Sequence, residues 1–132
     1  MTQDNLQLVQ QAYGYFKTGN LPALLGQMDP NIEWQLPKIP NARISGTRHG
    51  RGQVQEFFGT LATDQETISF EPREFVAQGD TVVAIGHCEW RVKETGKAFE
   101  SDFVHVFTVR NGAVVRFREL LDSQAAALAY QK

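Results

Sequence analysis

Apolar residues recur at helical spacing in four segments of the chain, and they alternate with polar residues in most of the remainder. The helical spacing predicts a first helix that begins at residue 2 or 4 and ends at about residue 18, before Gly19. A short second helix is predicted after Asn20, whose side chain can cap it. Two further helices are predicted over residues 53–62 and 124–130.

The alternation with a period of two predicts β-strands, because successive side chains of a strand point to opposite faces. The second half of the chain shows this pattern most clearly, with glycine-containing turns between its apolar runs. These runs predict antiparallel hairpins in a helices-first arrangement, which is an α+β layout. The predicted strands cover residues 32–36, 67–77, 81–93, 99–109 and 114–121.

The last predicted hairpin places an acid and a base on an apolar face. In the strand over 99–109, His105 shares its face with phenylalanines, and Glu119 does the same in the strand over 114–121. A three-residue loop over 110–112 pairs His105 with Phe117, which makes His105 and Glu119 diagonal neighbours. A two-residue Asn-Gly turn would set Phe107 against Arg116, so the apolar pattern favours the longer loop.

A two-residue turn at residues 95–96 would pair Val92 with Phe99 in the preceding hairpin. In that register Cys88 and Trp90 share the face of His105. The opposite, outer face mixes apolar and charged residues, which suits an interface between two copies of the chain, so we expect a homodimer through it. The apolar positions of that outer face are Val83, Ile85, Val104 and Val106.

Residues 37–52 carry prolines and glycines without strand or helix period, and they predict a long loop. Because loops of this length in compact domains are often functional, we expect it to form the rim of a cavity. Its cations would then meet an anionic group of a ligand; the alternative is a solvated surface loop. Those cations are Arg43, Arg48, His49 and Arg51.

Composition narrows the functional classes. The chain has 132 residues, of which 42% are hydrophobic and 21% charged, and a formal net charge of −2. One domain over residues 1–132 is expected, with neither nucleic acid nor a membrane as partner. Cys88 is the single cysteine and no leader pattern is visible, so we expect a cytoplasmic protein. The three histidines lack metal-ligand spacing and no nucleotide-binding loop is present, so we expect no metal and no cofactor.

Glu119 and His105 are the candidate catalytic residues. An ionised carboxylate facing an apolar interior is costly unless it is paired, so Glu119 either pairs structurally with His105 or serves as a general base. His105 would then hydrogen-bond a developing enolate oxygen or orient Glu119; its alternative role is that of a core histidine. A small apolar ligand is expected between aromatic walls. The candidate wall residues are Tyr13, Phe16, Trp34, Phe57, Trp90, Phe103 and Phe117.

Several segments, in order along nearly the whole chain, resemble the nuclear-transport-factor-2-like superfamily, and specifically its SnoaL-like and ketosteroid-isomerase-like members. The matching segments are YFKTGN, LPALLGQMDPNIEW, SGTRHGRGQVQEFF, FVAQGDTVVAIG and TGKAFESDFVHVFTVRNGAVVRFRELLD. The resemblance implies a cone-shaped α+β barrel in which a curved antiparallel sheet wraps around N-terminal helices. It also implies a deep apolar cavity and commonly a homodimer.

The resemblance carries over to few residues. His105 stands where ketosteroid isomerase has an acid that donates to the substrate oxyanion, and Glu119 fits the general base on the last strand of SnoaL-like cyclases and epoxide hydrolases. The isomerase's own base corresponds to Gln35-Leu36, which cannot take a proton. The expected function is cofactor-independent proton transfer, of isomerase, cyclase or hydratase type, on an apolar carbonyl compound. The alternative is a non-catalytic ligand-binding or assembly domain.

Overall fold

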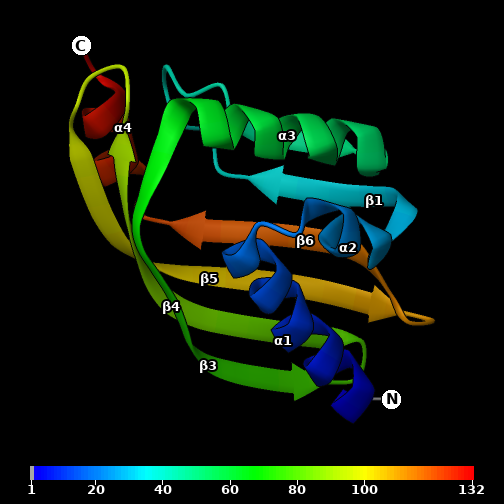
Figure 1. Ribbon diagram of the computed structural model, residues 1–132. Coiled ribbons are helices and arrows are strands. Elements are labelled where there is room, and N and C mark those ends of the chain that lie inside the picture. The colour runs from blue at the N-terminus through cyan, green and yellow to red at the C-terminus, as the bar shows by residue number, and fades with distance from the viewer. Residues whose placement is uncertain (1) are drawn as a thin grey trace.

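One curved sheet carries the fold, with helices on its concave side (Figure 1). The computed structural model describes residues 2–132. The elements are α1 (Thr2–Thr18), α2 (Leu21–Gly26), β1 (Met28–Leu36), β2 (Gly46–His49), α3 (Gly50–Asp64), β3 (Gln65–Gln78), β4 (Thr81–Val92), β5 (Ala98–Arg110), β6 (Ala113–Leu121) and α4 (Ser123–Tyr130).

The six strands lie in the order β2-β1-β6-β5-β4-β3. All neighbouring strands are antiparallel except β1 and β6, which run parallel. Helices α1, α2 and α3 cover the concave face, while α4 lies at the end of the sheet where β5 begins (Figure 1). The predicted α+β class is confirmed. The sheet curves around the helices without closing into a barrel.

The helix ends follow the sequence signals. Gly19 adopts φ of 74° directly after α1, a conformation that glycine reaches without steric cost. The Asn20 side chain then accepts a hydrogen bond from the backbone N–H of Ala23 at 3.3 Å and so caps α2. This tight connection turns the chain back over the sheet, so that α1 and α2 both face the interior.

The predicted loop over residues 37–52 is wrong in its second half. Residues 46–49 form β2, which pairs with β1 from Leu36 and Gly46 to Glu33 and His49. Helix α3 starts at Gly50, three residues before its predicted start at 53. Four residues are too few to reveal a strand period, so the pairing partner rather than the local pattern creates β2.

The register predicted for the last hairpin is also wrong, although His105, Phe117 and Glu119 lie on the predicted inner face; at its start Val114 takes the inner position that the pattern assigned to Val115. The turn has two residues, Asn111 and Gly112, both with positive φ (51° and 75°), and Arg110 pairs with Ala113. The pairing then shifts between residues 108 and 109, where Val115 is the extra residue of a β-bulge. The bulge restores the apolar face that a two-residue turn alone would have lost. As a result His105 lies directly opposite Glu119.

The connection between β4 and β5 is longer than predicted. Residues 93–97 form it, and the N–H of Val92 donates to the carbonyl oxygen of Lys97 at 2.8 Å. Phe99 consequently pairs with Trp90 rather than with Val92, and Cys88 pairs with Ser101. Because the register moves by an even number of residues, every side chain keeps its predicted face. The buried residues of β4 and β5 alternate as the sequence indicates.

Candidate functional site

A cavity of about 100 Å³ lies between the concave face of the sheet and the helices above it. Its walls are mostly aromatic and aliphatic side chains from α1, α2, α3 and every strand except β2. Few of the lining residues carry polar side-chain atoms. These are Tyr13, Gln27, Trp34, Gln65, His105 and Glu119.

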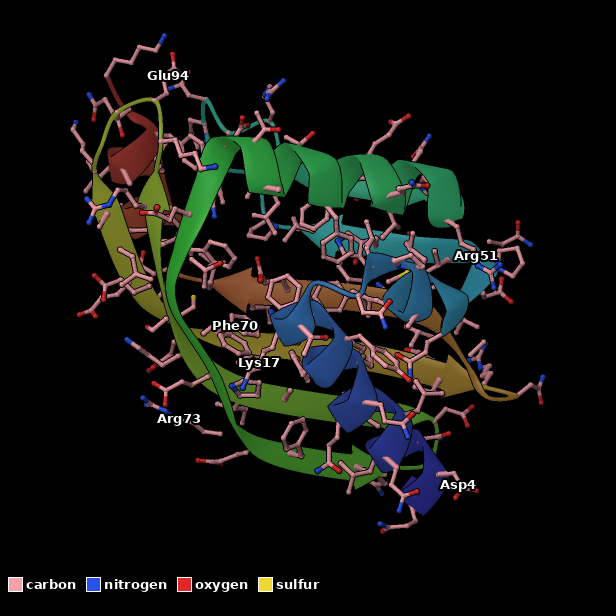
Figure 2. All side chains as sticks on the ribbon, in the orientation of Figure 1. Asp4, Lys17, Arg51, Phe70, Arg73 and Glu94 are labelled. Carbon is pink, nitrogen blue, oxygen red and sulfur yellow. The ribbon has the colours of Figure 1, made fainter. Side chains whose placement is uncertain are left out.

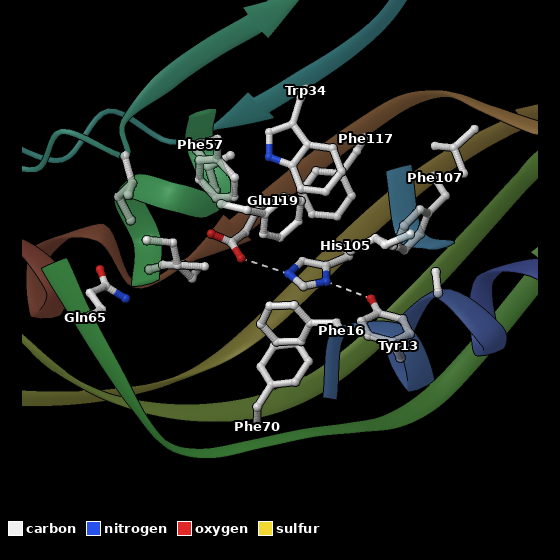
Figure 3. A pocket seen from close by; sticks show the side chains of 18 of the residues that line it. Tyr13, Phe16, Trp34, Phe57, Gln65, Phe70, His105, Phe107, Phe117 and Glu119 are labelled. Atoms are coloured by element: carbon white, nitrogen blue, oxygen red, sulfur yellow. Dashed lines mark hydrogen bonds and ion pairs between the residues drawn. The ribbon is translucent and has the colours of Figure 1, made fainter. Parts of the chain in front are cut away.

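Three of these polar residues form one hydrogen-bonded chain (Figure 3). The Tyr13 hydroxyl lies 2.7 Å from Nδ1 of His105, and Nε2 of His105 lies 2.8 Å from Oε2 of Glu119. The first contact is buried and the second half-buried. Tyr13 lies on α1, whereas His105 and Glu119 occupy facing positions of β5 and β6. Because the sheet curves around α1, the tyrosine hydroxyl reaches the His105–Glu119 pair.

The donors and acceptors along this chain follow from its chemistry. An ionised carboxylate can only accept, so Nε2 of His105 donates to Glu119. In the neutral imidazole Nδ1 is then the acceptor, and the Tyr13 hydroxyl donates to it. Burial, reinforced by the negative charge of Glu119, raises the pKa of Tyr13 well above its ordinary value of 10.0. Tyr13 therefore keeps its proton and remains the donor.

Glu119 is the member of the chain that can meet a ligand. Its side chain is 17% exposed, against 6% for His105. Its second oxygen, Oε1, makes no hydrogen bond to any residue in 2–132. The carboxylate is thus held by one oxygen, while the other is free to accept a proton.

An aromatic cage surrounds His105. The ring of Phe103 stacks on the imidazole at 4.3 Å between centroids, and the ring of Phe117 lies at 4.9 Å. Phe103 can take this position because the residue opposite it on β4 is Gly86; a Cβ there would meet the Phe103 ring at 2.5 Å and also the carbonyl oxygen of Glu71. The cage fixes the plane of the imidazole and shields it from water.

Six of the seven predicted wall residues line the cavity. Phe103 does not; it is 1% exposed, and its ring packs against both His105 and Phe70. The six that line the cavity are Tyr13, Phe16, Trp34, Phe57, Trp90 and Phe117.

Phe70 also lines the cavity, although it was not among the predicted wall residues. Phe70 and Phe75 both contact Tyr13, with ring centroids at 5.9 Å, although five residues of regular strand would place them on opposite faces. A register shift between Pro72 and Glu74 in β3 restores the common face. Figure 2 shows Phe70 directed inward, whereas Arg73 of the same strand points away from the helices.

A wider groove of about 540 Å³ adjoins the cavity between the ends of α1 and α3 and the start of β3. Residues common to the walls of both give the cavity its connection to the surface. The shared residues are Phe16, Phe58, Leu61, Gln65, Phe70 and Trp90.

The segment 37–52 contributes Ile39 and Ile44 to the wall of the cavity. None of its residues lines the groove. Its cations are engaged elsewhere. Arg43 pairs with Asp64 at 2.6 Å, and Arg48 donates to backbone carbonyls of the same segment, including that of Ile44. Arg51 donates to the carbonyl oxygen of Met28 at 2.8 Å, and His49 is exposed. The cavity thus meets this segment through its isoleucines, and the groove follows other elements.

Two findings concern other kinds of site. Within residues 2–132 no three potential metal ligands of the His, Cys, Asp or Glu type lie together. None of the helices in the same range has the length and apolarity needed to span a membrane.

Comparisons with known proteins agree with this fold. Residues 9–117 match the SnoaL-like domain family. An NTF2-like protein from Burkholderia xenovorans LB400 is 34% identical with a TM-score of 0.90, covering 99% of this chain and 98% of that one. One from Burkholderia thailandensis E264 is 26% identical with a TM-score of 0.88, covering 97% and 98%.

A third solved structure, of TerC co-crystallized with polyporic acid, is 28% identical with a TM-score of 0.84 and covers 98% of this chain and 99% of that one. A search of curated proteins finds no match. The family match spans well over half of the sequence. The chain therefore belongs to the SnoaL-like domain family, and its predicted place among nuclear-transport-factor-2-like proteins is confirmed.

Proposed function

We propose that this member of the SnoaL-like domain family catalyses cofactor-independent proton transfer on a small apolar carbonyl compound. The observation that carries the proposal is the Tyr13–His105–Glu119 chain, which ends in a carboxylate oxygen left free beside an aromatic cavity. A base held by one oxygen and open at the other suits the removal of a proton from carbon.

Glu119 is the general base. Its Oε1 takes the proton from the carbon next to the carbonyl, the electrons of that C–H bond form the C=C bond, and the carbonyl π electrons move to oxygen as an enolate. Return of the proton from Glu119 to a carbon atom restores the carbonyl and the carboxylate. Return of the proton to a different carbon of a conjugated enolate gives an isomerisation. In an intramolecular ring closure the enolate carbon instead attacks a second carbonyl carbon of the same molecule, and Glu119 returns the proton to the oxygen of that carbonyl.

His105 positions this base. Both of its ring nitrogens are engaged, at 2.7 Å and 2.8 Å, so its N–H stays on Glu119 and Tyr13 holds the other side of the ring. Of the two roles predicted for His105, orientation of Glu119 fits this geometry, whereas donation to an enolate would break a buried hydrogen bond. The aromatic cage adds to the same restraint.

The relative with polyporic acid supports a flat, oxygenated ring compound as ligand class. Size restricts the choice. Pockets that enclose drug-sized ligands measure about 300–1,000 Å³, so a cavity of about 100 Å³ accepts a single small ring without rearrangement. Larger ligands would extend into the adjoining groove.

Hydrogen–deuterium exchange into the methyl group of 4-fluoroacetophenone in D2O tests the proposal. The wild type is expected to accelerate exchange over buffer, and Glu119→Gln to reduce that acceleration by about 10²–10⁴-fold, because the amide keeps the shape but cannot take a proton. Glu89→Gln, on the outer face of β4, is the matched control and should leave exchange unchanged. Equal exchange in all three proteins would reject Glu119 as a base.

The second candidate function is ligand binding without turnover, and the small volume of the cavity favours it. In that case Tyr13, His105 and Glu119 form a structural hydrogen-bonded chain. The same assay separates the two candidates, since a binding protein would give saturable binding of 4-fluoroacetophenone with exchange at the rate of buffer alone.

We also propose that two copies of the chain associate through the outer sheet face. Val83, Ile85, Val104 and Val106 are only half-buried in the single chain, and they form a continuous patch across β4 and β5. Such a patch, bordered by charged residues, matches the composition of homodimer interfaces. A cytoplasmic location stays a prediction that depends on the unpaired Cys88.

A further inference from the structure

An enolate intermediate needs a hydrogen-bond donor for its oxygen, and His105 is not free to be that donor. Both of its nitrogens are bound within the Tyr13–His105–Glu119 chain. Among the residues that line the cavity, two other side chains present N–H groups without a partner in residues 2–132. They are the amide of Gln65 and the indole of Trp34.

Gln65 lies at the junction of α3 and β3, where the cavity meets the groove. The residue is 5% exposed, so its amide is almost wholly buried. Its oxygen accepts a hydrogen bond from the Tyr130 hydroxyl. Figure 3 shows Gln65 on the side of the cavity toward which the Glu119 carboxylate points, with the amide nitrogen nearer the cavity than the amide oxygen. No residue in 2–132 accepts a hydrogen bond from this nitrogen, so it can donate to an acceptor atom of a ligand in the cavity.

Tyr130 determines which way this amide points. Its hydroxyl makes no hydrogen bond other than that to Gln65 in the described part of the chain, so its proton needs the amide oxygen. Burial raises the pKa of Tyr130 above its ordinary value of 10.0, which keeps that proton in place. A flipped amide would leave the tyrosine proton without an acceptor.

Helix α4, which carries Tyr130, is fixed to the rest of the fold. The Thr95 hydroxyl donates to the carbonyl oxygen of Ala129 at 2.6 Å, and the Lys97 ammonium donates to that of Gln131 at 2.6 Å. Tyr130 itself is 7% exposed. The terminal helix therefore acts through Tyr130 as a positioning element for the Gln65 amide.

We propose that the Gln65 amide nitrogen donates a hydrogen bond to the carbonyl oxygen of the ligand, opposite the carbon that faces Glu119, so that the site selects carbonyl compounds over hydrocarbons of the same shape. The role of Gln65 as a donor to an enolate rests on the proposed function. Its role as a donor to the carbonyl of a bound ligand does not require turnover. A neutral donor of this kind stabilises the charge that develops on the oxygen.

The test compares two ligands that differ only at the acceptor atom. 4-Fluoroacetophenone carries a carbonyl, and 4-fluoro-α-methylstyrene replaces its oxygen with CH₂. Dissociation constants from ¹⁹F NMR titrations give a carbonyl preference for each protein. The wild type should prefer the ketone by about 2- to 12-fold, the range that one hydrogen bond contributes.

Gln65→Met removes the donor at similar size and should bring that preference to about one, with little change for the styrene. Gln65→Glu keeps a hydrogen-bond partner for Tyr130 but presents an acceptor to the ligand in place of the donor. It should also bring the carbonyl preference to about one, and it serves as the test if the methionine variant does not fold. Tyr130→Phe frees the amide and should reduce the preference partway, while Tyr15→Phe, a tyrosine outside the cavity wall, should keep the wild-type value. A loosened structure would weaken both ligands equally and leave the ratio unchanged.

Three results would overturn the assignment. The first is an unchanged preference in both Gln65 variants. The second is a loss of preference in Trp34→Phe alone, which would assign the role to the indole. The third is no binding of either ligand by the wild type. The two proposals can fail separately. If the wild type does not accelerate hydrogen–deuterium exchange but still prefers the ketone, Glu119 is rejected as the base while Gln65 remains the donor to the ligand.

Discussion

Replacing Tyr13 with phenylalanine isolates the first hydrogen bond of the buried chain. The change removes one oxygen and keeps the ring, which packs against Phe70, Phe75 and Phe107. It leaves Nδ1 of His105, in a residue 4% exposed, without its partner at 2.7 Å. A buried acceptor left unpaired costs about 1–3 kcal/mol of unfolding free energy. A water molecule entering the cavity would bring the cost toward the lower figure.

Urea unfolding followed by tryptophan fluorescence measures this cost, since Trp34 and Trp90 both lie in the cavity wall. Tyr15→Phe is the matched control. Its ring is half-exposed and its hydroxyl makes no hydrogen bond within residues 2–132, so a change within about 0.5 kcal/mol is expected.

A second background strengthens the test. In His105→Leu the Tyr13 hydroxyl has already lost its acceptor, so adding Tyr13→Phe should cost almost nothing or even stabilise the fold. The coupling between the two changes is expected at about 0.5–3 kcal/mol. An equal cost of Tyr13→Phe in both backgrounds would refute the hydrogen-bonded chain, and with it the positioning of Glu119 through His105.

Other consequences are open to measurement. Gly86→Ala should lower the unfolding free energy by about 1–3 kcal/mol, because the new Cβ overpacks the Phe103 ring at 2.5 Å; a neutral result in urea would contradict that packing. Ile85→Lys should convert a dimer into a monomer in sedimentation velocity without changing ligand affinity, and a wild type that is monomeric at micromolar concentration would count against the interface. Hydrogen bonds to Asp102 and to a second carboxylate raise the pKa of His87 above 6.5. This contribution to stability is fully present below pH 6.5 and is lost as pH rises through the raised value. His87→Gln should therefore flatten the melting temperature between pH 5.5 and 8, and identical pH profiles would exclude the effect.

The faces of the strands could be predicted from the sequence because alternation survives any even shift of register. His105 and Glu119 were placed on one face for that reason, although the turn, the bulge at Val115 and the direct pairing were all missed. A bulge adds one residue without a local sequence signal of its own. Which residues of two neighbouring strands lie directly opposite each other could therefore be determined only from the structure.

Other parts of the site depend on contacts between distant segments. Gln65 carries no strand or helix pattern that marks it, and its role depends on Tyr130 at the other end of the chain. The short strand β2 exists because β1 offers an edge to it. Such features follow from tertiary pairing, whereas helix ends such as Gly19 and Asn20 follow from local chemistry and were predicted correctly.

The parallel pairing of β1 with β6 bears on how the molecule is made. Trp34 in β1 pairs with Phe117 in β6, so one edge of β1 stays unpaired until β6 has left the ribosome. The Tyr13 hydroxyl likewise has no partner until His105 of β5 has been made. Contacts of such long sequence separation slow folding and prolong the exposure of apolar strands during synthesis. The wall residues of β6 and the Glu119 carboxylate are added last, so a growing chain that has ended before β6 holds most of the cavity wall but not the base.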